Sequence, residues 1–232
     1  VYFYMPMKRT IYILSNGEIK RRQNTVFVET TEGQKKFLPV ENIEQMLIFG
    51  EINLNKKLLD FLSQTGIILH FFNYYGYYSG SFYPREHLNS GMIIIKQVET
   101  YLDEQKRLDL AKRFVSGAVK NMKKVLKYYQ KQKTELQKVI QPIIYLEGLI
   151  ETQKSIPELM AIEGNIRGYY YNGFDIILNN PDFQFEVRTR QPPRNRLNTL
   201  ISFGNSLLYV TILSEIYKTH LDPRIGYLHS PI

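Results

Sequence analysis

The sequence contains no cysteine, which excludes disulfides, thiolate chemistry and cysteine-based zinc sites. No apolar run approaches the roughly 20 residues of a membrane span, and the mixed first residues do not resemble a signal peptide. The motifs of phosphate-binding loops in NTPases, of serine hydrolases and of zincin metalloproteases are also absent. Because nothing in the sequence suggests export, we expect a cytoplasmic protein.

Acidic residues are fewer than basic ones. The 22 Asp and Glu residues stand against 30 Lys and Arg residues, which gives a formal net charge of +8. This excess favours a polyanionic partner, either nucleic acid or an acidic membrane surface. The membrane is the weaker interpretation, because the basic helices lack an adjoining exposed face rich in Phe and Leu. We therefore expect no membrane partner.

The order of the expected elements predicts an α+β protein with two domains. Residues 8–84 show short strand patterns, a hairpin signal at Asn16-Gly17, a turn at Glu32-Gly33 and one helix that ends before Gly66. Residues 85–91 form the expected linker. From residue 92 the apolar period changes from two to 3.6, so residues 92–232 are predicted to form a larger all-α domain.

A lysine-rich segment lies early in this helical domain. Its lysines follow helical spacing and define a predicted basic face, which comprises Lys120, Lys123, Lys124 and Lys127 and continues to Lys131. One interpretation is an ordinary solvated helix surface. The other is a surface that follows a nucleic-acid backbone and gains affinity by releasing counterions.

The last stretch, residues 188–229, combines arginines with a long apolar helix. Four arginines flank Pro192-Pro193, namely Arg188, Arg190, Arg194 and Arg196. Polar residues recur along the helix within roughly a 60° arc, and they are Asn198, Ser202, Asn205 and Tyr209. Burying such a stripe is costly unless its groups find partners. We therefore expect the stripe to line a solvated site, with the arginines at its mouth placed to contact a nucleic acid.

Five residues form the candidate catalytic site: Glu163, Arg167, Asn205, Tyr209 and His229. A carboxylate and an imidazole can bind a divalent ion such as Mg²⁺ or Mn²⁺, and arginine can bind phosphate oxygens. Simpler interpretations remain open, because Glu163 and Arg167 are spaced as an ordinary i,i+4 ion pair. A single histidine such as His229 is more often packed or exposed than a ligand, and Tyr209 fits a core position.

Several segments together resemble one known family. LMAIEGNIRGYYY (residues 159–171) is similar to the E-G-x-x-R-x-x-Y signature of the CRISPR-associated spacer integrases, the "Cas one" family. The stretches RTRQPPRNRLNTLISFGNSLLYV and HLDPRIGYLHS resemble the same family. So do IFGEINLNKKLLDFLSQTGIILHFFN and GSFYPREHLNSG in the first half of the chain. The resemblance covers residues 8–229.

The resemblance implies a metal-dependent DNA endonuclease and integrase that inserts spacer DNA into a CRISPR array in antiviral defence. It implies Glu163 and His229 as ligands of Mg²⁺ or Mn²⁺, and it places Tyr209 at an active-site position. The implied partners are double-stranded and branched DNA, a second copy bound through the β-rich domain, and the small "Cas two" protein.

The resemblance also implies an acidic ligand about a dozen positions after His229. This sequence ends at Ile232, so we expect it to be incomplete and its metal site to lack one carboxylate. The alternative from another class is a non-catalytic basic scaffold that binds nucleic acid and a protein partner.

Overall fold

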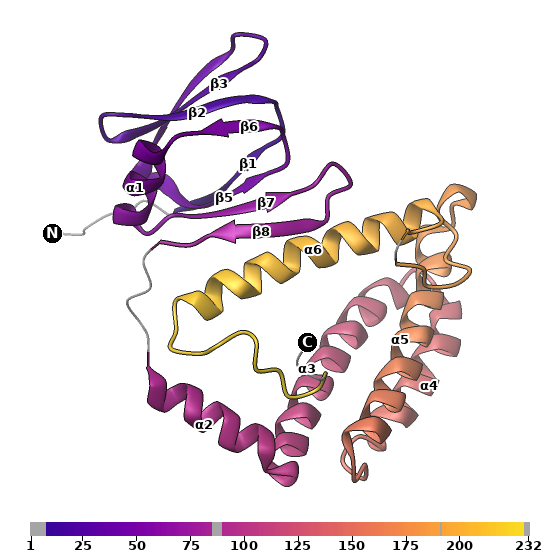
Figure 1. Cartoon of the computed structure of the whole chain (residues 1–232). Coiled ribbons are helices and arrows are strands. Elements are labelled where there is room, and N and C mark those ends of the chain that lie inside the picture. Colours follow the sequence, from indigo (N-terminus) through magenta and orange to yellow (C-terminus); the bar gives the residue numbers. More distant parts are fainter. Residues whose placement is uncertain (1–7, 85–89, 191, 230–232) are drawn as a thin grey trace, which may run out of the picture. The chain divides into compact units, whose positions relative to one another are not determined.

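The computed structural model describes residues 8–84, 90–190 and 192–229. The chain divides into two compact units, and Figure 1 shows the order of their elements. The first unit comprises Val1–Asn89 and Phe203–Lys218, and the second comprises Ser90–Ser202 and Thr219–Ile232. The predicted α+β class is confirmed, because every strand in the described residues lies in the first unit.

The division differs from the two predicted domains at the long helix α6, Arg196–Tyr217. This helix begins in the second unit and continues in the first, where Val210 packs with Leu47 and Phe72 in a small apolar cluster. Val210 is fully buried there. The pattern change near residue 91 therefore marks one boundary between the units, and α6 forms a second one far along the chain.

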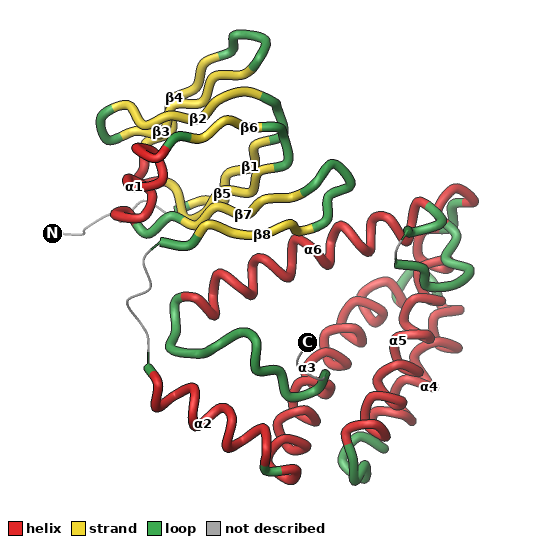
Figure 2. Tube along the Cα trace, in the orientation of Figure 1, coloured by secondary structure: helices red, strands yellow, loops and turns green. Residues whose placement is uncertain are grey.

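Two four-stranded sheets build the first unit, and Figure 2 shows its strands in yellow. The first sheet has the order β1-β5-β7-β8 and the second has the order β4-β3-β2-β6. The strands are β1 (Arg9–Ile13), β2 (Gly17–Arg22), β3 (Thr25–Thr30), β4 (Lys35–Pro39), β5 (Ile43–Ile48), β6 (Ile52–Leu54), β7 (Ile68–Phe72) and β8 (Tyr78–Phe82). A short 3₁₀ helix, Val40–Asn42, precedes β5.

The predicted hairpin at Asn16-Gly17 is wrong. β1 pairs in parallel with β5, whereas β2 pairs with β3 and β6 in the other sheet. The dipeptide therefore carries the chain from one sheet to the other, and the Asn16 side chain accepts a bond from the Glu51 N–H at 2.9 Å. Glycine is required at position 17 because a Cβ would lie 2.1 Å from the Glu29 carbonyl oxygen.

The turn at Glu32-Gly33 is confirmed, since β3 and β4 pair antiparallel and Gly33 has a φ of 81°. The predicted helix is also present as α1, Lys56–Thr65. It begins at Lys56, directly after β6 and the capping residue Asn55. Asn55 caps its first turn, and Gly66 ends it in the left-handed conformation with a φ of 73°.

The second unit consists of helices around one apolar core. They are α2 (Gly91–Leu102), α3 (Glu104–Gln130), α4 (Gln137–Gly148), α5 (Ile156–Leu178) and the first turns of α6, with short 3₁₀ helices at Thr134–Leu136 and Pro181–Phe183. Ser155 caps α5, and Pro157 lies in its first turn, where proline is favoured. Pro142 lies inside α4, which continues through it.

Helix α6 is the one helix of the described residues that is long and apolar enough to cross a membrane by length and composition. This is weak evidence, because core helices of soluble proteins pass the same test. Two of its polar side chains are bonded within the protein: Ser214 contacts His70, and Asn198 contacts the preceding loop. Those bonds connect both halves of α6 to other segments of the same chain.

Candidate functional site

Glu163 and Arg167 form the ion pair that their spacing predicts. Both lie on α5, and Arg167 Nε is 2.6 Å from Glu163 Oε1. The Glu163 side chain is 12% exposed and the Arg167 side chain 39% exposed, so the carboxylate sits at the edge of the core and the guanidinium reaches farther out. Neighbouring Ile166 is fully buried, which fixes this face of α5. The pair presents one acceptor and several donors at a partly shielded position.

The segment that carries His229 is held against α2 and α3. The Gln97 side chain donates to the Asp222 carbonyl at 3.2 Å and accepts from the Asp222 N–H at 2.9 Å. Arg107 Nε donates to the Tyr227 carbonyl at 2.9 Å. Next to His229, Leu228 packs against the same core that contains Ile166 of α5. His229 itself is exposed.

Glu163 and His229 therefore belong to one compact unit, and each adjoins a residue of its apolar core. A carboxylate oxygen and an imidazole nitrogen are donors that suit Mg²⁺ or Mn²⁺. Across the described residues, no group of three or more His, Cys, Asp and Glu side chains is placed to hold a metal ion. The chemistry of these two donors fits such an ion, for which they would supply two of the several ligands that it takes.

Arg188 is bound by the polar stripe of α6. Its guanidinium donates to Asn198 Oδ1 at 3.0 Å and to Ser202 Oγ at 3.0 Å. Asn198 also accepts from the Thr189 N–H at 3.1 Å and donates to the Val187 carbonyl at 2.8 Å. Asn198 is completely buried. The structure thus gives Asn198 a positioning role for the arginine loop in place of the predicted direct contact with DNA.

The other arginines of this loop are exposed. Arg196 pairs with Asp182 at 3.0 Å, and both side chains are two thirds exposed. Arg190 and Arg194 are exposed near the two prolines. Sequence reasoning missed both Asp182 and Asn195, whose side chain accepts a bond from the Asn198 N–H at 2.8 Å and so caps α6. The pattern Asn195-Arg-Leu-Asn198 before an apolar run was a recognisable cap signal.

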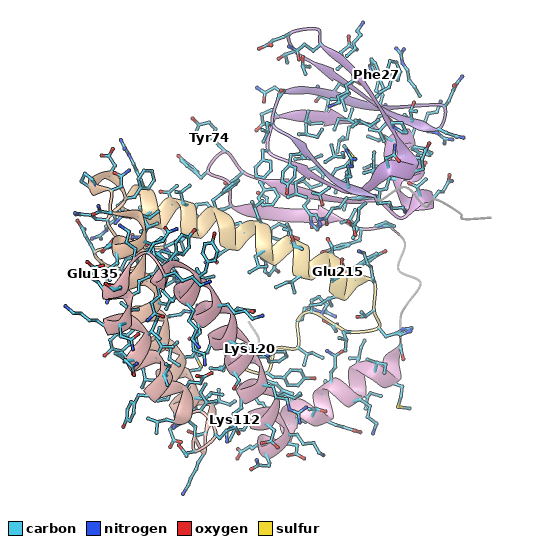
Figure 3. All side chains as sticks on the ribbon, turned by 180° about the vertical axis from the view of Figure 1, so that it is seen from behind. Phe27, Tyr74, Lys112, Lys120, Glu135 and Glu215 are labelled. Atoms are coloured by element: carbon cyan, nitrogen blue, oxygen red, sulfur yellow. The ribbon has the colours of Figure 1, made fainter. Side chains whose placement is uncertain are left out.

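The predicted basic face of α3 needs one correction. Lys120, Lys124 and Lys127 are exposed, as predicted for a surface that meets a polyanion, and Lys120 is labelled on α3 in Figure 3. Lys123 instead turns toward α4, where it pairs with Glu147 and is only 20% exposed. Leu126 and Val119 on the buried face set this rotation. Lys123 therefore contributes to helix packing.

Tyr209 and Asn205 lie on the part of α6 that belongs to the first unit, and both are exposed. The Tyr209 ring is 53% exposed and packs against Tyr78 of β8, with ring centroids 5.3 Å apart. The core interpretation of Tyr209 is thus wrong, since half of its surface is accessible. The Tyr78 hydroxyl shares a hydrogen bond of 2.8 Å with Ser81 Oγ.

A buried polar chain continues from Ser81 through the first unit. His70 Nδ1 lies 2.6 Å from Ser81 Oγ, and His70 Nε2 lies 2.7 Å from Ser214 Oγ on α6. Ser214 donates to Gln45 Oε1 at 2.5 Å. His70 is completely buried, and burial lowers its pKa from 6.5 to about 4. These bonds join α6 to β5, β7 and β8.

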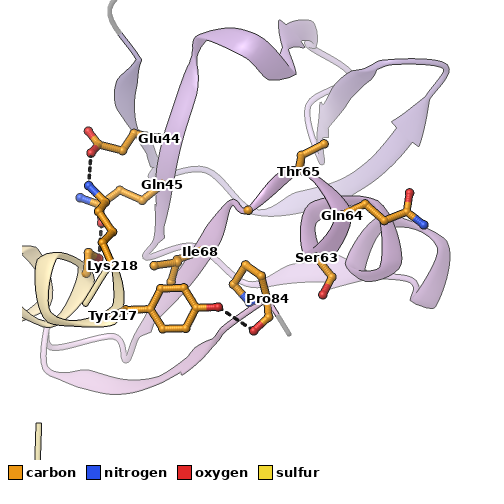
Figure 4. Close-up of a pocket in the computed structure, with 11 residues that line it drawn as sticks. Glu44, Gln45, Ser63, Gln64, Thr65, Ile68, Pro84, Tyr217 and Lys218 are labelled. Carbon is orange, nitrogen blue, oxygen red and sulfur yellow. Dashed lines mark hydrogen bonds and ion pairs between the residues drawn. The ribbon is translucent and has the colours of Figure 1, made fainter. Parts of the chain in front are cut away.

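A cavity of about 460 Å³ opens in the same unit beside Ser214 and Gln45 (Figure 4). At its rim Lys218 Nζ lies 2.6 Å from Glu44 and 2.6 Å from Glu215. The Tyr217 hydroxyl donates to the Pro84 carbonyl at 2.8 Å. Two carboxylates thus compensate the one ammonium group, and the cavity carries no excess positive charge for an anionic ligand.

The chain matches one protein family along most of its length. The family described as "CRISPR associated protein Cas1" matches residues 11–232. A CRISPR-associated endonuclease Cas1 of Thermodesulfovibrio yellowstonii is 61% identical over 224 residues, which are 97% of this chain and 68% of that protein. A CRISPR-associated endonuclease Cas1 of Thermotoga maritima is 49% identical over 95% of this chain and 66% of its own length. The chain thus spans about two thirds of these relatives.

Solved structures give the same result for the fold. A Cas1 protein from Thermotoga maritima matches with a TM-score of 0.83 and 47% identity, over 97% of this chain and 70% of that one. A casposase bound to an integration product matches with a TM-score of 0.80 and 22% identity, over 97% and 66%. The Cas6-RT-Cas1–Cas2 complex matches with a TM-score of 0.74 and 17% identity, over 96% and 26%. At these low identities the last two show the fold alone.

Proposed function

This chain belongs to the Cas1 family of CRISPR-associated proteins, and on this premise we propose that it acts as a metal-dependent DNA endonuclease and integrase. The proposed reaction is phosphodiester transesterification that inserts spacer DNA into a CRISPR array. Its relatives carry the name endonuclease, and the casposase that shares its fold is bound to an integration product. The net charge of +8 favours the DNA substrate.

The observation that carries this proposal is the position of Glu163. It is the largely shielded carboxylate of the α5 segment that resembles the family signature, and it is paired with Arg167. The segment carrying His229 is anchored to the same core through Leu228. We propose that Glu163 and His229 would hold a Mg²⁺ or Mn²⁺ ion, which when bound would stabilise negative charge on a phosphate.

The remaining roles follow from what the side chains can donate. The Glu163 pair uses Arg167 Nε, so the terminal nitrogens of Arg167 can donate to phosphate oxygens and orient the phosphodiester. Arg188, held in place by Asn198 and Ser202, is preorganised near the start of α6. In the reaction a DNA 3′-hydroxyl, or water in the nuclease mode, forms a new P–O bond while the bond to the leaving oxygen breaks.

The proposed assembly contains double-stranded or branched DNA, a second copy of the chain bound through the β-rich unit, and the small Cas2 protein. Cas2 is named in the Cas6-RT-Cas1–Cas2 complex, which shares this fold, and its pairing with this chain is part of the proposal. A cytoplasmic location is proposed with it. The non-catalytic scaffold remains the second candidate, because two donors are fewer than a typical site for these ions contains.

The test is cleavage of duplex and branched DNA in Mn²⁺, with and without a chelator. We expect Glu163→Ala to abolish metal-dependent cleavage while DNA binding stays nearly unchanged. Glu163→Gln is expected to do the same, and it keeps an oxygen that can accept from Arg167. The matched control is Glu151→Ala, which removes an exposed carboxylate outside the proposed site.

Binding of Mn²⁺, followed by electron paramagnetic resonance, supplies a readout independent of turnover. Both Glu163 variants and His229→Ala should weaken Mn²⁺ binding, whereas Glu151→Ala should not. Undiminished cleavage and Mn²⁺ binding in Glu163→Gln would contradict the assignment of Glu163 as a metal ligand. Salt-sensitive DNA binding without any metal-dependent turnover would instead support the scaffold.

A further inference from the structure

A shallow hollow of about 480 Å³ lies at the turn between α3 and α4. Five residues line it, and they are Lys127, Gln130, Lys131, Thr134 and Gln137. Each of these side chains can donate a hydrogen bond, two of them carry a positive charge, and none of the five is acidic or apolar. Gln130 donates to the Gln137 amide oxygen, which leaves the Gln137 nitrogen able to donate to a ligand.

The hollow continues a lysine stripe along the exposed face of α3. Lys120, Lys124, Lys127 and Lys131 follow one another at spacings of four, three and four, and all are exposed. From Lys120 to Lys131 the stripe extends about 16 Å at 1.5 Å per residue. A DNA strand advances 3.4 Å per nucleotide, so the stripe is as long as roughly five nucleotides.

The lysines of this stripe differ from other lysines of the same helix. In the described part of the chain the four form no ion pair, whereas Lys123 pairs with Glu147. Lys112, also on α3, donates to the Glu151 carbonyl at 2.8 Å. The positive charge of the stripe is therefore not compensated locally, and an anionic ligand can displace its counterions.

We propose that this hollow is a phosphate-binding subsite for the backbone of a nucleic acid, with the stripe as its continuation. Two ammonium groups, one hydroxyl and one amide are donors that suit the oxygens of a backbone phosphate. The open shape admits a continuous backbone, and the length of the stripe fits several consecutive nucleotides. An acidic membrane is disfavoured because no apolar side chain lines the hollow to enter the lipid.

This inference rests on the proposed function only in taking the polymer to be DNA. The subsite is separate from Glu163 in sequence and in chemistry, since it binds without a metal and breaks no bond. Loss of the subsite should change affinity and its salt dependence, whereas loss of Glu163 should change turnover. The experiments can therefore contradict the phosphate-binding subsite without contradicting the proposed role of Glu163, and the reverse.

The test is the affinity for fluorescently labelled duplex and branched DNA, measured by anisotropy between about 50 and 200 mM salt. The variant Lys127→Ala with Lys131→Ala removes two phosphate contacts. The slope of log K against log salt should become less negative by about 2, because each contact contributes about 0.9. At 0.1 M salt this change in slope corresponds to an affinity lower by roughly sixtyfold.

The matched control is Lys133→Ala with Lys138→Ala. It removes the same charge from the same turn, and neither residue lines the hollow. In this control variant the slope of log K against log salt should change by well under one. Thr134→Val removes a donor without changing the charge, so we expect a loss of a few-fold in affinity with an unchanged slope. Lys127→Arg with Lys131→Arg should keep the slope of the unmodified protein.

Equal losses in the target and control pairs would overturn the subsite and leave only a general effect of charge. An unchanged slope in the target pair, with a circular dichroism spectrum like that of the unmodified protein, would overturn it as well. The remaining measurement is binding to vesicles that contain acidic phospholipid. If the Lys127→Ala, Lys131→Ala variant loses vesicle binding but keeps DNA binding, the partner of the hollow is an acidic membrane and not a nucleic acid.

Discussion

The buried imidazole of His70 should make the first unit sensitive to acid. His70 is fully buried between Ser81 and Ser214, and burial lowers its pKa from 6.5 to about 4. Because Ser214 donates its proton to Gln45, its oxygen accepts from His70 Nε2. The neutral ring with its proton on Nε2 can therefore donate to Ser214 and accept from Ser81. A charged ring at this buried position would lose its hydration, so burial disfavours the protonated form.

The sign of the effect follows from the two protonation equilibria. Between about pH 6.5 and pH 4 the unfolded chain binds a proton at this histidine and the folded chain does not. The free energy of unfolding should therefore fall as the pH falls through this window, and this contribution is complete below about pH 4. A lowering from 6.5 to about 4 corresponds to about 3 kcal/mol at the lower end.

The assay is urea unfolding from about pH 7 to about pH 4.5, on the unmodified protein and on His70→Gln. Glutamine cannot titrate there, so its free energy of unfolding should vary less with pH, by roughly 2 kcal/mol or more. His220→Gln is the control, because His220 is exposed. Identical pH dependence in the protein and His70→Gln, or an ordinary pKa for His70 by NMR, would refute the reasoning.

Local signals in the sequence predict the helices and their ends well. Ser155 with Pro157 begins α5, and Gly66 ends α1 in the left-handed conformation, because caps depend on a few neighbouring residues. The i,i+4 pair of Glu163 and Arg167 is local in the same way and is confirmed. Such features need no knowledge of which distant segments meet.

Pairing between distant strands could not be predicted in the same way. Asn16-Gly17 satisfies the local rule for a hairpin, yet β1 finds its partner in β5, about 30 residues later. Glycine is needed at position 17 for another reason, which is the close approach of the Glu29 carbonyl. Parallel pairing is decided by the whole sheet, and a dipeptide carries no information about it.

The polar stripe of α6 is divided between the two units. Asn198 and Ser202 hold Arg188 within the second unit, whereas Asn205 and Tyr209 are exposed in the first. Helical period reveals which residues share a face, and it does not reveal that the helix passes from one compact unit to another. The cost of burying Asn198 is met by its bonds to the loop that precedes α6.

Two further substitutions test how close contacts stabilise the fold, and both are measured by urea unfolding. Gly17→Ala should cost about 2 kcal/mol or more, because its Cβ would approach the Glu29 carbonyl oxygen at 2.1 Å and force β2 from β3; a cost below about 0.5 kcal/mol would contradict that contact. Asn198→Ala removes the bonds to residues 187–189 and leaves backbone groups of that loop without partners. We expect a loss of about 3 kcal/mol, since each buried group that loses its partner costs about 1 to 3 kcal/mol. Thr199→Ala, at the exposed neighbouring position, should cost less than about 1 kcal/mol. Equal small losses at both positions would show that the loop does not depend on the buried asparagine.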